Sequence, residues 1–365
     1  MSKFIPNDTR TKLALKSAYG SFLLFKTILN FKADRNDKRP RIFYGGARTG
    51  DLGGPLVKVQ RLRHYFPEHS WNFNLVYCLS NAPYLNDMSL AILRKRRIPI
   101  IHNQNGMFYK AWYDGDWRAQ NARMSRTYHQ ASHVFWQSEF CRRSAQKFLG
   151  DRDGPGEVLY NAVDTNHFKP LDRAPNERIK LLLTGKIDNH LFYRLESTLR
   201  GFAYAVMKGL DGEITIAGWI APIVQKKIYD LANELRIYDR LKFIGAYNQT
   251  DAPAIYSSAD IYIMTKHNDP CPNTVLEAMA CGLPVVHSIS GGVPELVGDT
   301  APGVFVPEDF ERVHVPSAKE LGEAILIAAT NRNELSKKAR RRAVENFDIA
   351  WWIERHRQIF NQFLN

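Results

Sequence analysis

From residue 41 onward, short apolar runs alternate with longer segments of helical period. Each run is rich in branched and aromatic residues and is bounded by polar ones, which predicts a buried strand. The first series of predicted strands is 41–44, 73–78, 98–102, 133–137 and 157–160. The second series is 180–184, 213–217, 241–244, 260–264, 284–287 and 304–306. Strands that alternate with helices in this way predict parallel sheets covered by helices.

A polar, proline-bounded stretch at residues 169–180, KPLDRAPNERIK, separates the two series. It predicts a linker between two Rossmann-like α/β domains that face each other across a cleft, with ligands at the carboxyl ends of the strands. We expect these domains to span residues 37–172 and 173–349. The aromatic-rich segment 350–365 is expected to pack back on the first domain.

Residues 1–36 form a separate basic segment, which has no acidic residue between positions 9 and 33. On a helical wheel its apolar residues fall on one half: Leu13, Leu15, Phe22, Leu24, Phe25, Ile28, Leu29 and Phe31. Lys12, Lys16 and Lys26 fall on the other half. Such an amphipathic helix either lies on an anionic membrane surface or packs its apolar half on the protein body. Lysines interrupt every apolar run before the ~20 residues of a spanning helix, so we expect neither a signal peptide nor a transmembrane segment.

The composition, with 44% hydrophobic and 24% charged residues in a chain of 365, is typical of a soluble enzyme and excludes a disordered chain. The net charge of +13 favours an anionic partner: nucleic acid, phospholipid headgroups or a phosphorylated substrate. The basic runs at 94–97 and 337–342 lack interleaved aromatic residues, so nucleic-acid binding is the least favoured of the three. Four scattered cysteines predict a reducing, cytoplasmic location, with peripheral attachment to the inner face of the membrane if the basic segment binds there.

The strongest candidate site lies in residues 267–297, HNDPCPNTVLEAMACGLPVVHSISGGVPELV. The pattern predicts a strand end, a tight loop, a helix that begins near Asn273 and Thr274, and a second turn at SGG. The amide groups at the start of a helix bind anions, and Asp269 and Glu277 flank this position. Two carboxylates beside an anion site are favourable where they accept hydrogen bonds from hydroxyl groups, such as those of a sugar and a ribose.

DPCPNTVLEAMACGLPVV followed by GGVPELV resembles the nucleotide-sugar signature of the family 4 glycosyltransferases, which have the GT-B fold. That signature is an acid, seven residues and then Glu. The resemblance implies that Glu277 binds the nucleotide ribose, and that Asp269, where the family usually has Glu, contacts the transferred sugar. It also implies that loop residues hold the diphosphate and the sugar, namely Cys271, Pro272, Asn273 and Thr274.

Further segments extend the resemblance over most of residues 41–350. They are GDLGGPLVKVQRL (50–62), WQSEFCRR (136–143), LYNAVDTNHFKP (159–170) and KFIGAYNQTDAPAIYSSADIYIM (242–264). In the last of them, Tyr247 is a candidate contact of the base. For the first, the resemblance implies that Gly53 and Gly54 let backbone amides approach the donor phosphates.

Two departures from the family pattern concern the donor site. The family usually offers an Arg and, five residues later, a Lys to the diphosphate, whereas this chain has Lys186 and then Leu191, with Arg194 as the nearest substitute. Many members also place a first-domain histidine near the donor sugar. Here PIIHNQNG puts Asn105 in that column and His102 three residues earlier, so both are candidate contacts of the sugar.

The resemblance implies a retaining glycosyltransferase that moves a sugar from a nucleoside diphosphate sugar to a hydroxyl acceptor, with no metal or other cofactor. The basic N-terminal segment favours a lipid-linked or surface glycan as the acceptor. Asp114 and Asp116 in YDGDW imitate a metal-binding acid pair, but such a triplet is common in turns. The alternative is a non-catalytic sugar-binding or scaffolding relative, which Asp269 and Leu191 keep open.

Overall fold

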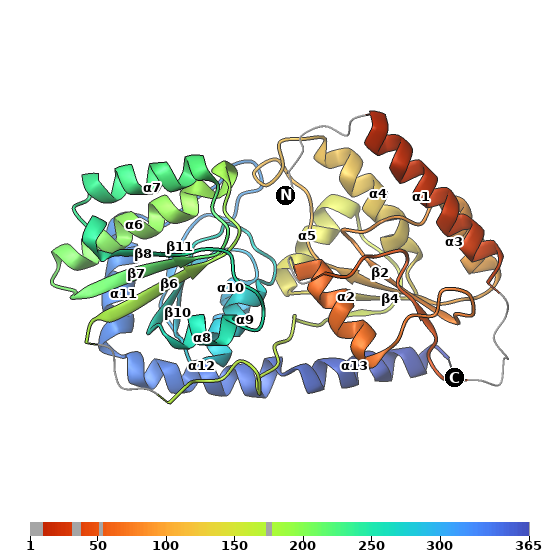
Figure 1. Cartoon of the computed structure of the whole chain (residues 1–365). Coiled ribbons are helices and arrows are strands. Elements are labelled where there is room, and N and C mark those ends of the chain that lie inside the picture. The colour runs from red at the N-terminus through yellow and green to blue at the C-terminus, as the bar shows by residue number, and fades with distance from the viewer. Residues whose placement is uncertain (1–9, 31–37, 51–53, 173–176, 365) are drawn as a thin grey trace. The chain divides into compact units, whose positions relative to one another are not determined.

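The computed structural model describes residues 10–30, 38–50, 54–172 and 177–364 (Figure 1). The chain forms two compact units. The first comprises Met1–Tyr160, Phe310–Arg312 and Trp351–Asn365, and the second comprises Asn161–Asp309 and Val313–Ala350. None of the helices in the described ranges combines the length and the apolar character needed to span a bilayer.

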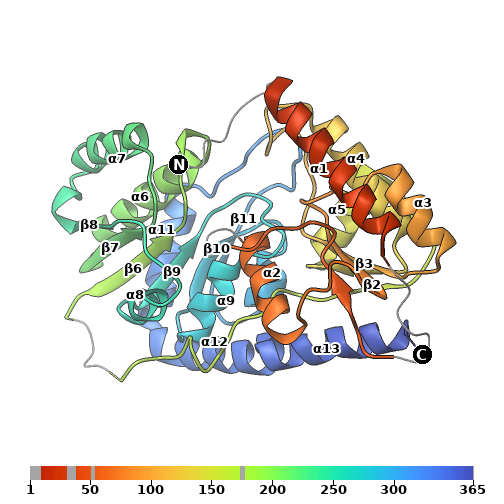
Figure 2. The same cartoon turned by 45° about the vertical axis from the view of Figure 1, so that its right-hand side comes forward.

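The first unit contains a parallel sheet, whose described strands run in the order β1-β2-β3-β4-β5. The strands are β1 (Ile42–Phe43), β2 (Leu75–Leu79), β3 (Ile100–Gln104), β4 (His133–Trp136) and β5 (Gly156–Val158). Helices cover both faces, as expected for strands that are apolar throughout. One face carries α1 (Arg10–Ile28), α3 (Asp87–Lys95), α4 (Trp117–Gln130) and α5 (Glu139–Leu149), and the other carries α2 (Gly54–Tyr65) and α13 (Ile349–Gln362) (Figures 1 and 2).

Helix α13 packs on the first sheet through a buried histidine. The Tyr77 hydroxyl donates to His356 Nε2 at 3.0 Å, and His356 Nδ1 lies 2.7 Å from the Trp352 carbonyl oxygen. Burial lowers the pKa of His356 to about 3, so the ring is neutral and its Nδ1 carries the proton. Phe360 of the same helix is also completely buried.

Helix α1 is fixed to the first unit at its C-terminal end. The Arg96 guanidinium donates to the carbonyl oxygens of Thr27, Ile28 and Asn30 at 2.8, 2.9 and 3.1 Å. The Asn30 side chain in turn donates to the Phe73 carbonyl oxygen at 2.9 Å. These bonds satisfy carbonyl groups that a helix end leaves without partners.

The face of α1 that packs on the protein differs from the apolar half predicted from the wheel. Leu23 and Thr27 are buried, whereas Phe22, Phe25 and Ile28 are 46%, 53% and 46% exposed. The alternative in which the apolar half packs on the protein body is therefore wrong for these three residues. Thr27 tolerates burial because its hydroxyl donates to the Leu23 carbonyl oxygen of its own helix at 2.8 Å. Phe31 lies outside the described residues.

The second unit contains a parallel sheet in the order β11-β10-β9-β6-β7-β8. Its strands are β6 (Ile179–Thr184), β7 (Gly212–Ala217), β8 (Leu241–Ile244), β9 (Ile261–Met264), β10 (Val285–Ile289) and β11 (Gly303–Phe305). Core residues of α6 (Phe192–Met207), α7 (Pro222–Glu234) and α11 (Ala318–Thr330) cover one face. The other face carries α8 (Ala252–Ser257), α9 (Asn273–Ala280) and α12 (Arg332–Phe347) (Figure 1).

The strand order of the second sheet reverses between β6 and β9. From β6 the chain adds β7 and β8 on one side, and from β9 it adds β10 and β11 on the other. Ligands of open α/β sheets bind at the carboxyl ends of the strands where the order reverses. Each predicted strand overlaps an observed one, which confirms the prediction of two parallel α/β sheets. The cleft between the domains stays a prediction.

Candidate active site

The loop that carries Asp269 follows β9, one of the two strands between which the order of the second sheet reverses. Asp269 is held by an ion pair from its Oδ2 to Lys266 Nζ at 2.8 Å. Its Oδ1 accepts a hydrogen bond from the Cys271 backbone amide at 3.2 Å. The Asp269 side chain is 12% exposed, so its carboxylate is fixed in position before any ligand binds.

The SGG turn after β10 closes on this loop. Gly291 has φ +66°, and a Cβ built on it would lie 2.4 Å from the Asp269 carbonyl oxygen. The Gly292 amide donates to the same oxygen at 2.9 Å. Position 291 therefore requires glycine for two reasons, the left-handed backbone and the close approach. The glycine turn fixes the backbone of Asp269.

Helix α9 begins at Asn273, directly after the loop. Pro272 is its N-cap, and no side chain caps the first turn. The Oδ1 atom of Asn273 is buried and has no hydrogen-bond partner within the described part of the chain. This helix start therefore presents amide groups that a bound anion can satisfy. Its eight residues also contain Glu277, one turn further along.

Asn161 of the LYNAVD segment holds the loop through Cys271, which lies in the same unit. The Asn161 side chain donates to the Cys271 carbonyl oxygen at 2.7 Å, and its backbone amide donates to Cys271 Sγ at 3.2 Å. Cys271 is buried, which suits a structural thiol that shapes the loop.

Glu277 lies in a cluster of hydroxyl groups. It is 4% exposed, and its Oε2 accepts a hydrogen bond from the Tyr256 hydroxyl at 3.0 Å. Thr184 Oγ1 lies 3.2 Å from the Tyr256 hydroxyl and 2.8 Å from the Tyr262 hydroxyl. Tyr247 belongs to the same group: burial and then Tyr262 raise its pKa to about 12, with Glu277 also raising it and Thr184 opposing the shift. The two candidates Glu277 and Tyr247 are thus brought together.

The three cluster members Thr184, Tyr256 and Tyr262 are absent from the sequence prediction. They come from β6, α8 and β9, and only the strand order brings them together. Thr184 and Tyr262 lie in the predicted strands 180–184 and 260–264, where the apolar pattern indicates packing, and Tyr256 lies in the matched segment 242–264 without a predicted role. Lys266 is also absent from the sequence prediction, although it precedes Asp269 by three residues in the chain.

The basic candidates near β6 differ in exposure. Lys186 is exposed, and its ammonium lies 5.2 Å from the centre of the Trp219 ring. Arg194 is 4% exposed and donates to the Thr184 carbonyl oxygen at 3.3 Å, while its buried Nε has no hydrogen-bond partner among the described residues. Leu191, which stands at the usual lysine position, packs against the core instead. Arg194 therefore brings a buried cation to the carboxyl end of β6.

In the first unit, His102 and Asn105 have different surroundings. His102 is 1% exposed, and its Nε2 lies 2.8 Å from the Gln104 side-chain oxygen. Burial lowers the pKa of His102 to about 4, so the ring is neutral. Asn105 follows the end of β3, is half-buried and donates to the Asn81 side-chain oxygen at 2.7 Å.

A buried lysine, Lys58 of α2, reaches the same strand end. Its Nζ donates to Asn103 Oδ1 at 2.7 Å and to Asn105 Oδ1 at 3.3 Å. Lys58 is absent from the sequence prediction, although it lies in the glycine-rich segment 50–62. Of the two glycines predicted there, Gly54 begins α2 and Gly53 lies outside the described residues.

Other charged motifs have structural partners. Asp116 of the YDGDW segment is the N-cap of α4 and accepts from the Ala119 amide at 2.9 Å. In the basic run of α12, Arg340 donates to the carbonyl oxygens of Phe168 and Ala280 at 2.9 and 2.7 Å. Arg342 donates to the Leu296 carbonyl oxygen at 2.7 Å. These side chains therefore fix elements of their own units.

Curated relatives match short parts of the chain. D-inositol 3-phosphate glycosyltransferase of Saccharomonospora viridis is 38% identical over 82 residues, which are 22% of this chain and 19% of that protein. Spore coat protein SA of Bacillus subtilis is 32% identical over 113 residues, 30% of this chain and 28% of that protein. The matched part thus spans less than a third of either relative.

Solved structures match over most of the chain. HepE of Anabaena in complex with UDP has a TM-score of 0.64 at 18% identity, covering 85% of this chain and 82% of that one. A glycosyltransferase of Rickettsia africae has a TM-score of 0.64 at 16% identity, covering 87% and 84%. At these identities the likeness establishes the fold.

Two family models match successive parts of the chain. Residues 31–167 match the model described as Glycosyltransferase Family 4, and residues 173–346 match Glycosyl transferases group 1. Because both models describe glycosyltransferases and the fold agrees, the chain belongs to the family 4 glycosyltransferases of the GT-B fold.

Proposed function

We propose that this protein is a retaining glycosyltransferase, which transfers a sugar from a nucleoside diphosphate sugar to a hydroxyl acceptor. The observation that carries the proposal is the meeting of Glu277, the Asp269 loop, the start of α9 and Arg194 where the strand order reverses. The second unit thus holds both an acid that can accept hydrogen bonds from the hydroxyl groups of a ribose and donors that can bind a diphosphate. Residues 173–349 form the donor domain in this proposal, and residues 37–172 form the acceptor domain.

The ribose site is centred on Glu277. Its buried carboxylate accepts hydrogen bonds from the ribose hydroxyl groups, while the Tyr256 hydroxyl holds one carboxylate oxygen. Burial and the neighbouring Tyr262 raise the pKa of Tyr247, so its hydroxyl stays neutral, and we expect its ring to contact the base.

The diphosphate site consists of the amides of Asn273 and Thr274 with the cations of Lys186 and Arg194. Negative charge accumulates on the diphosphate as the glycosidic bond breaks, and fixed donors stabilise that charge. No general base is assigned, because in this family the departing phosphate is implied to assist deprotonation of the acceptor. From the first unit, Gly53 and Gly54 are proposed to let backbone amides approach the phosphates.

The sugar site is assigned to the Asp269 loop. Asp269 has a shorter side chain than the Glu usual in the family, but its ion pair with Lys266 fixes the carboxylate. Cys271 and Pro272 shape the loop beside it. Asn105 and His102 of the first unit remain proposed contacts of the sugar, with Asn105 the more accessible of the two.

We also propose that the acceptor is a lipid-linked or surface glycan and that the protein works on the cytoplasmic face of an anionic membrane. The acid-free segment 9–33 and the exposed side chains of Phe22, Phe25 and Ile28 support this proposal. Vesicle flotation tests it. Phe25→Ser should reduce recovery with anionic vesicles, whereas Ile327→Ser, an equally exposed position in the second unit, should not. Equal recovery with neutral vesicles would contradict it.

Isothermal titration against UDP, GDP, ADP and CMP, with and without EDTA, tests the donor site. UDP is the first choice because HepE was solved in complex with UDP. We expect one nucleoside diphosphate to bind at micromolar concentration regardless of EDTA, and Glu277→Ala to abolish sugar transfer. Binding without turnover in any donor and acceptor pair would favour the non-catalytic alternative. Binding that EDTA abolishes would contradict the metal-independent site, and no binding would overturn the proposal.

A further inference from the structure

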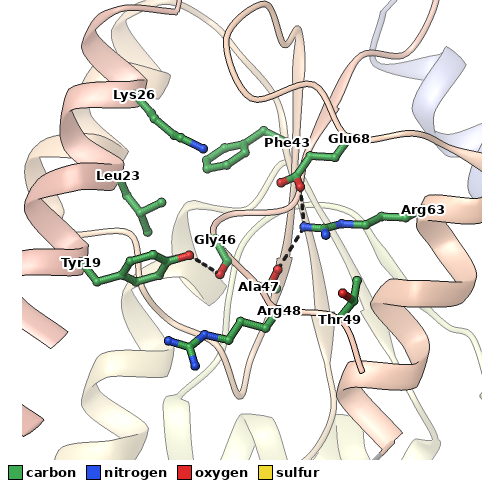
Figure 3. Close-up of a pocket in the computed structure, with 10 residues that line it drawn as sticks. All are labelled: Tyr19, Leu23, Lys26, Phe43, Gly46, Ala47, Arg48, Thr49, Arg63 and Glu68. Carbon is green, nitrogen blue, oxygen red and sulfur yellow. Dashed lines mark hydrogen bonds and ion pairs between the residues drawn. The ribbon is translucent and has the colours of Figure 1, made fainter. Parts of the chain in front are cut away.

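A pocket of about 320 Å³ lies in the first unit, between α1 and the loop that follows β1 (Figure 3). This volume falls in the lower range of small-molecule sites. The lining residues come from α1, from the end of β1 with its loop, and from α2 with the segment after it: Tyr19, Leu23, Lys26, Phe43, Gly46, Ala47, Arg48, Thr49, Arg63 and Glu68. None of them belongs to the donor site proposed above.

The shape of the pocket is fixed by close packing of α1 on a glycine turn. Gly46 has φ +83°, and a Cβ there would lie 2.7 Å from Leu23 Cδ1. The Tyr19 hydroxyl donates to the Gly46 carbonyl oxygen at 2.7 Å. Only glycine therefore allows α1 to pack this closely, and the wall of the pocket exists before any ligand binds.

The charges that line the pocket do not cancel. Arg63 is paired with Glu68 and donates to the Ala47 carbonyl oxygen at 3.2 Å. Lys26 and Arg48, in contrast, form no ion pair with any of the residues that the structure describes. The positive charges of Lys26 and Arg48 therefore remain in the pocket beside the ion pair of Arg63 and Glu68.

Lys26 is held over aromatic rings. Its ammonium lies 5.9 Å from the centre of the Phe43 ring, 5.4 Å from that of Trp71 and 5.0 Å from that of Phe22. Figure 3 shows Lys26 reaching toward Phe43 from α1, while Arg63 reaches in from the opposite side. The rings attract the cation and leave its hydrogens available to an anion.

We infer that this pocket binds the phosphate group of a small organophosphate or of a phospholipid. The fork of Arg48 matches phosphate oxygens, Lys26 adds a point charge, and the Thr49 hydroxyl is a further donor. The apolar wall of Leu23 and Phe43 suits the carbon skeleton next to the phosphate. This site goes beyond the proposed function, because binding there needs neither a donor nor a transfer step.

Two experiments distinguish a soluble organophosphate from a phospholipid headgroup as the source of the phosphate. For the soluble source, we would titrate the protein with glycerol 3-phosphate and, as the uncharged counterpart, with glycerol. Binding of glycerol 3-phosphate alone is expected, and Lys26→Gln or Arg48→Gln should weaken it at least tenfold. Lys208→Gln is the matched control, because Lys208 is exposed and lies 5.7 Å from a tyrosine ring in the second unit.

For the lipid source, we would compare flotation with vesicles of phosphatidylglycerol and of phosphatidylcholine. Recovery with phosphatidylglycerol that both pocket variants lower, together with weak binding of glycerol 3-phosphate, would assign the site to a headgroup. Tight binding of glycerol 3-phosphate without vesicle recovery would assign it to a soluble phosphate. The inference is overturned if neither ligand binds, or if both pocket variants bind as the wild type does. Circular dichroism of each variant checks that the fold is kept, and omission of any nucleotide sugar keeps the result independent of the donor site.

Discussion

Glu277→Gln separates a ribose ligand from a structural acid. The replacement keeps the shape of the side chain and keeps an oxygen that can accept from the Tyr256 hydroxyl, 3.0 Å away in the wild type. A hydrogen bond to a charged group contributes about 1.5–3 kcal/mol and a neutral one about 0.5–1.5 kcal/mol, so each ribose hydroxyl loses about 1 kcal/mol. Two ribose hydroxyl groups together lose about 2 kcal/mol, which raises the Kd of the nucleotide roughly 30-fold.

Stability should respond differently from affinity. Glu277 is 4% exposed, and a buried carboxylate is costly to desolvate, so the neutral amide should leave the free energy of unfolding unchanged or raise it. Titration with the nucleotide found for the wild type measures the Kd, and urea unfolding measures stability. Glu234→Gln is the control, because that side chain is 64% exposed in the same unit. A Kd within twofold of the wild type would refute the role of Glu277, and a large loss of stability would show that the acid is structural.

Three further predictions concern the Asp269 loop, the buried His356 of α13 and the end of α1. Gly291→Ala places a methyl group 2.4 Å from the Asp269 carbonyl oxygen at φ +66°, so the free energy of unfolding should fall by at least ~1–3 kcal/mol and donor affinity should fall with it. Gly245→Ala, with open space around it, should do neither, and equal melting temperatures for the two variants would contradict this account. Burial lowers the pKa of His356 from 6.5 to about 3, so the unfolded chain takes up the proton first as pH falls. The free energy of unfolding from urea titrations should therefore fall below pH ~6.5, by up to about 1.4 kcal/mol per pH unit from this group, and a flat profile between pH ~7 and ~5 would contradict it. Arg96→Ala removes the bonds that hold the C-terminal end of α1, so amide exchange in α1 should accelerate while exchange in the second unit does not change.

The strands could be predicted from the sequence because buried parallel strands are short and apolar throughout. The Asp269 loop and the start of α9 could be predicted because both lie within one continuous motif. The hydroxyl groups around Glu277 could not, since Thr184 and Tyr262 lie on strands far apart in sequence that become neighbours only in the folded sheet. The buried face of α1 could not be predicted for a different reason. A helical wheel ranks residues by polarity, but Thr27 can be buried because its hydroxyl donates a hydrogen bond to a carbonyl oxygen of its own helix.

In the proposed donor site, both acids already have partners in the folded chain. Asp269 is paired with Lys266, and Glu277 accepts from Tyr256, so both carboxylates hold their positions without a ligand. We therefore propose that a nucleotide sugar binds without reorganising them, which is the condition under which oriented groups accelerate a reaction. The start of α9 has no side-chain cap, and we propose that the amides of Asn273 and Thr274 donate to the ligand there. We therefore propose that the acids contribute orientation, and that the helix start contributes binding energy that increases as charge develops on the departing diphosphate.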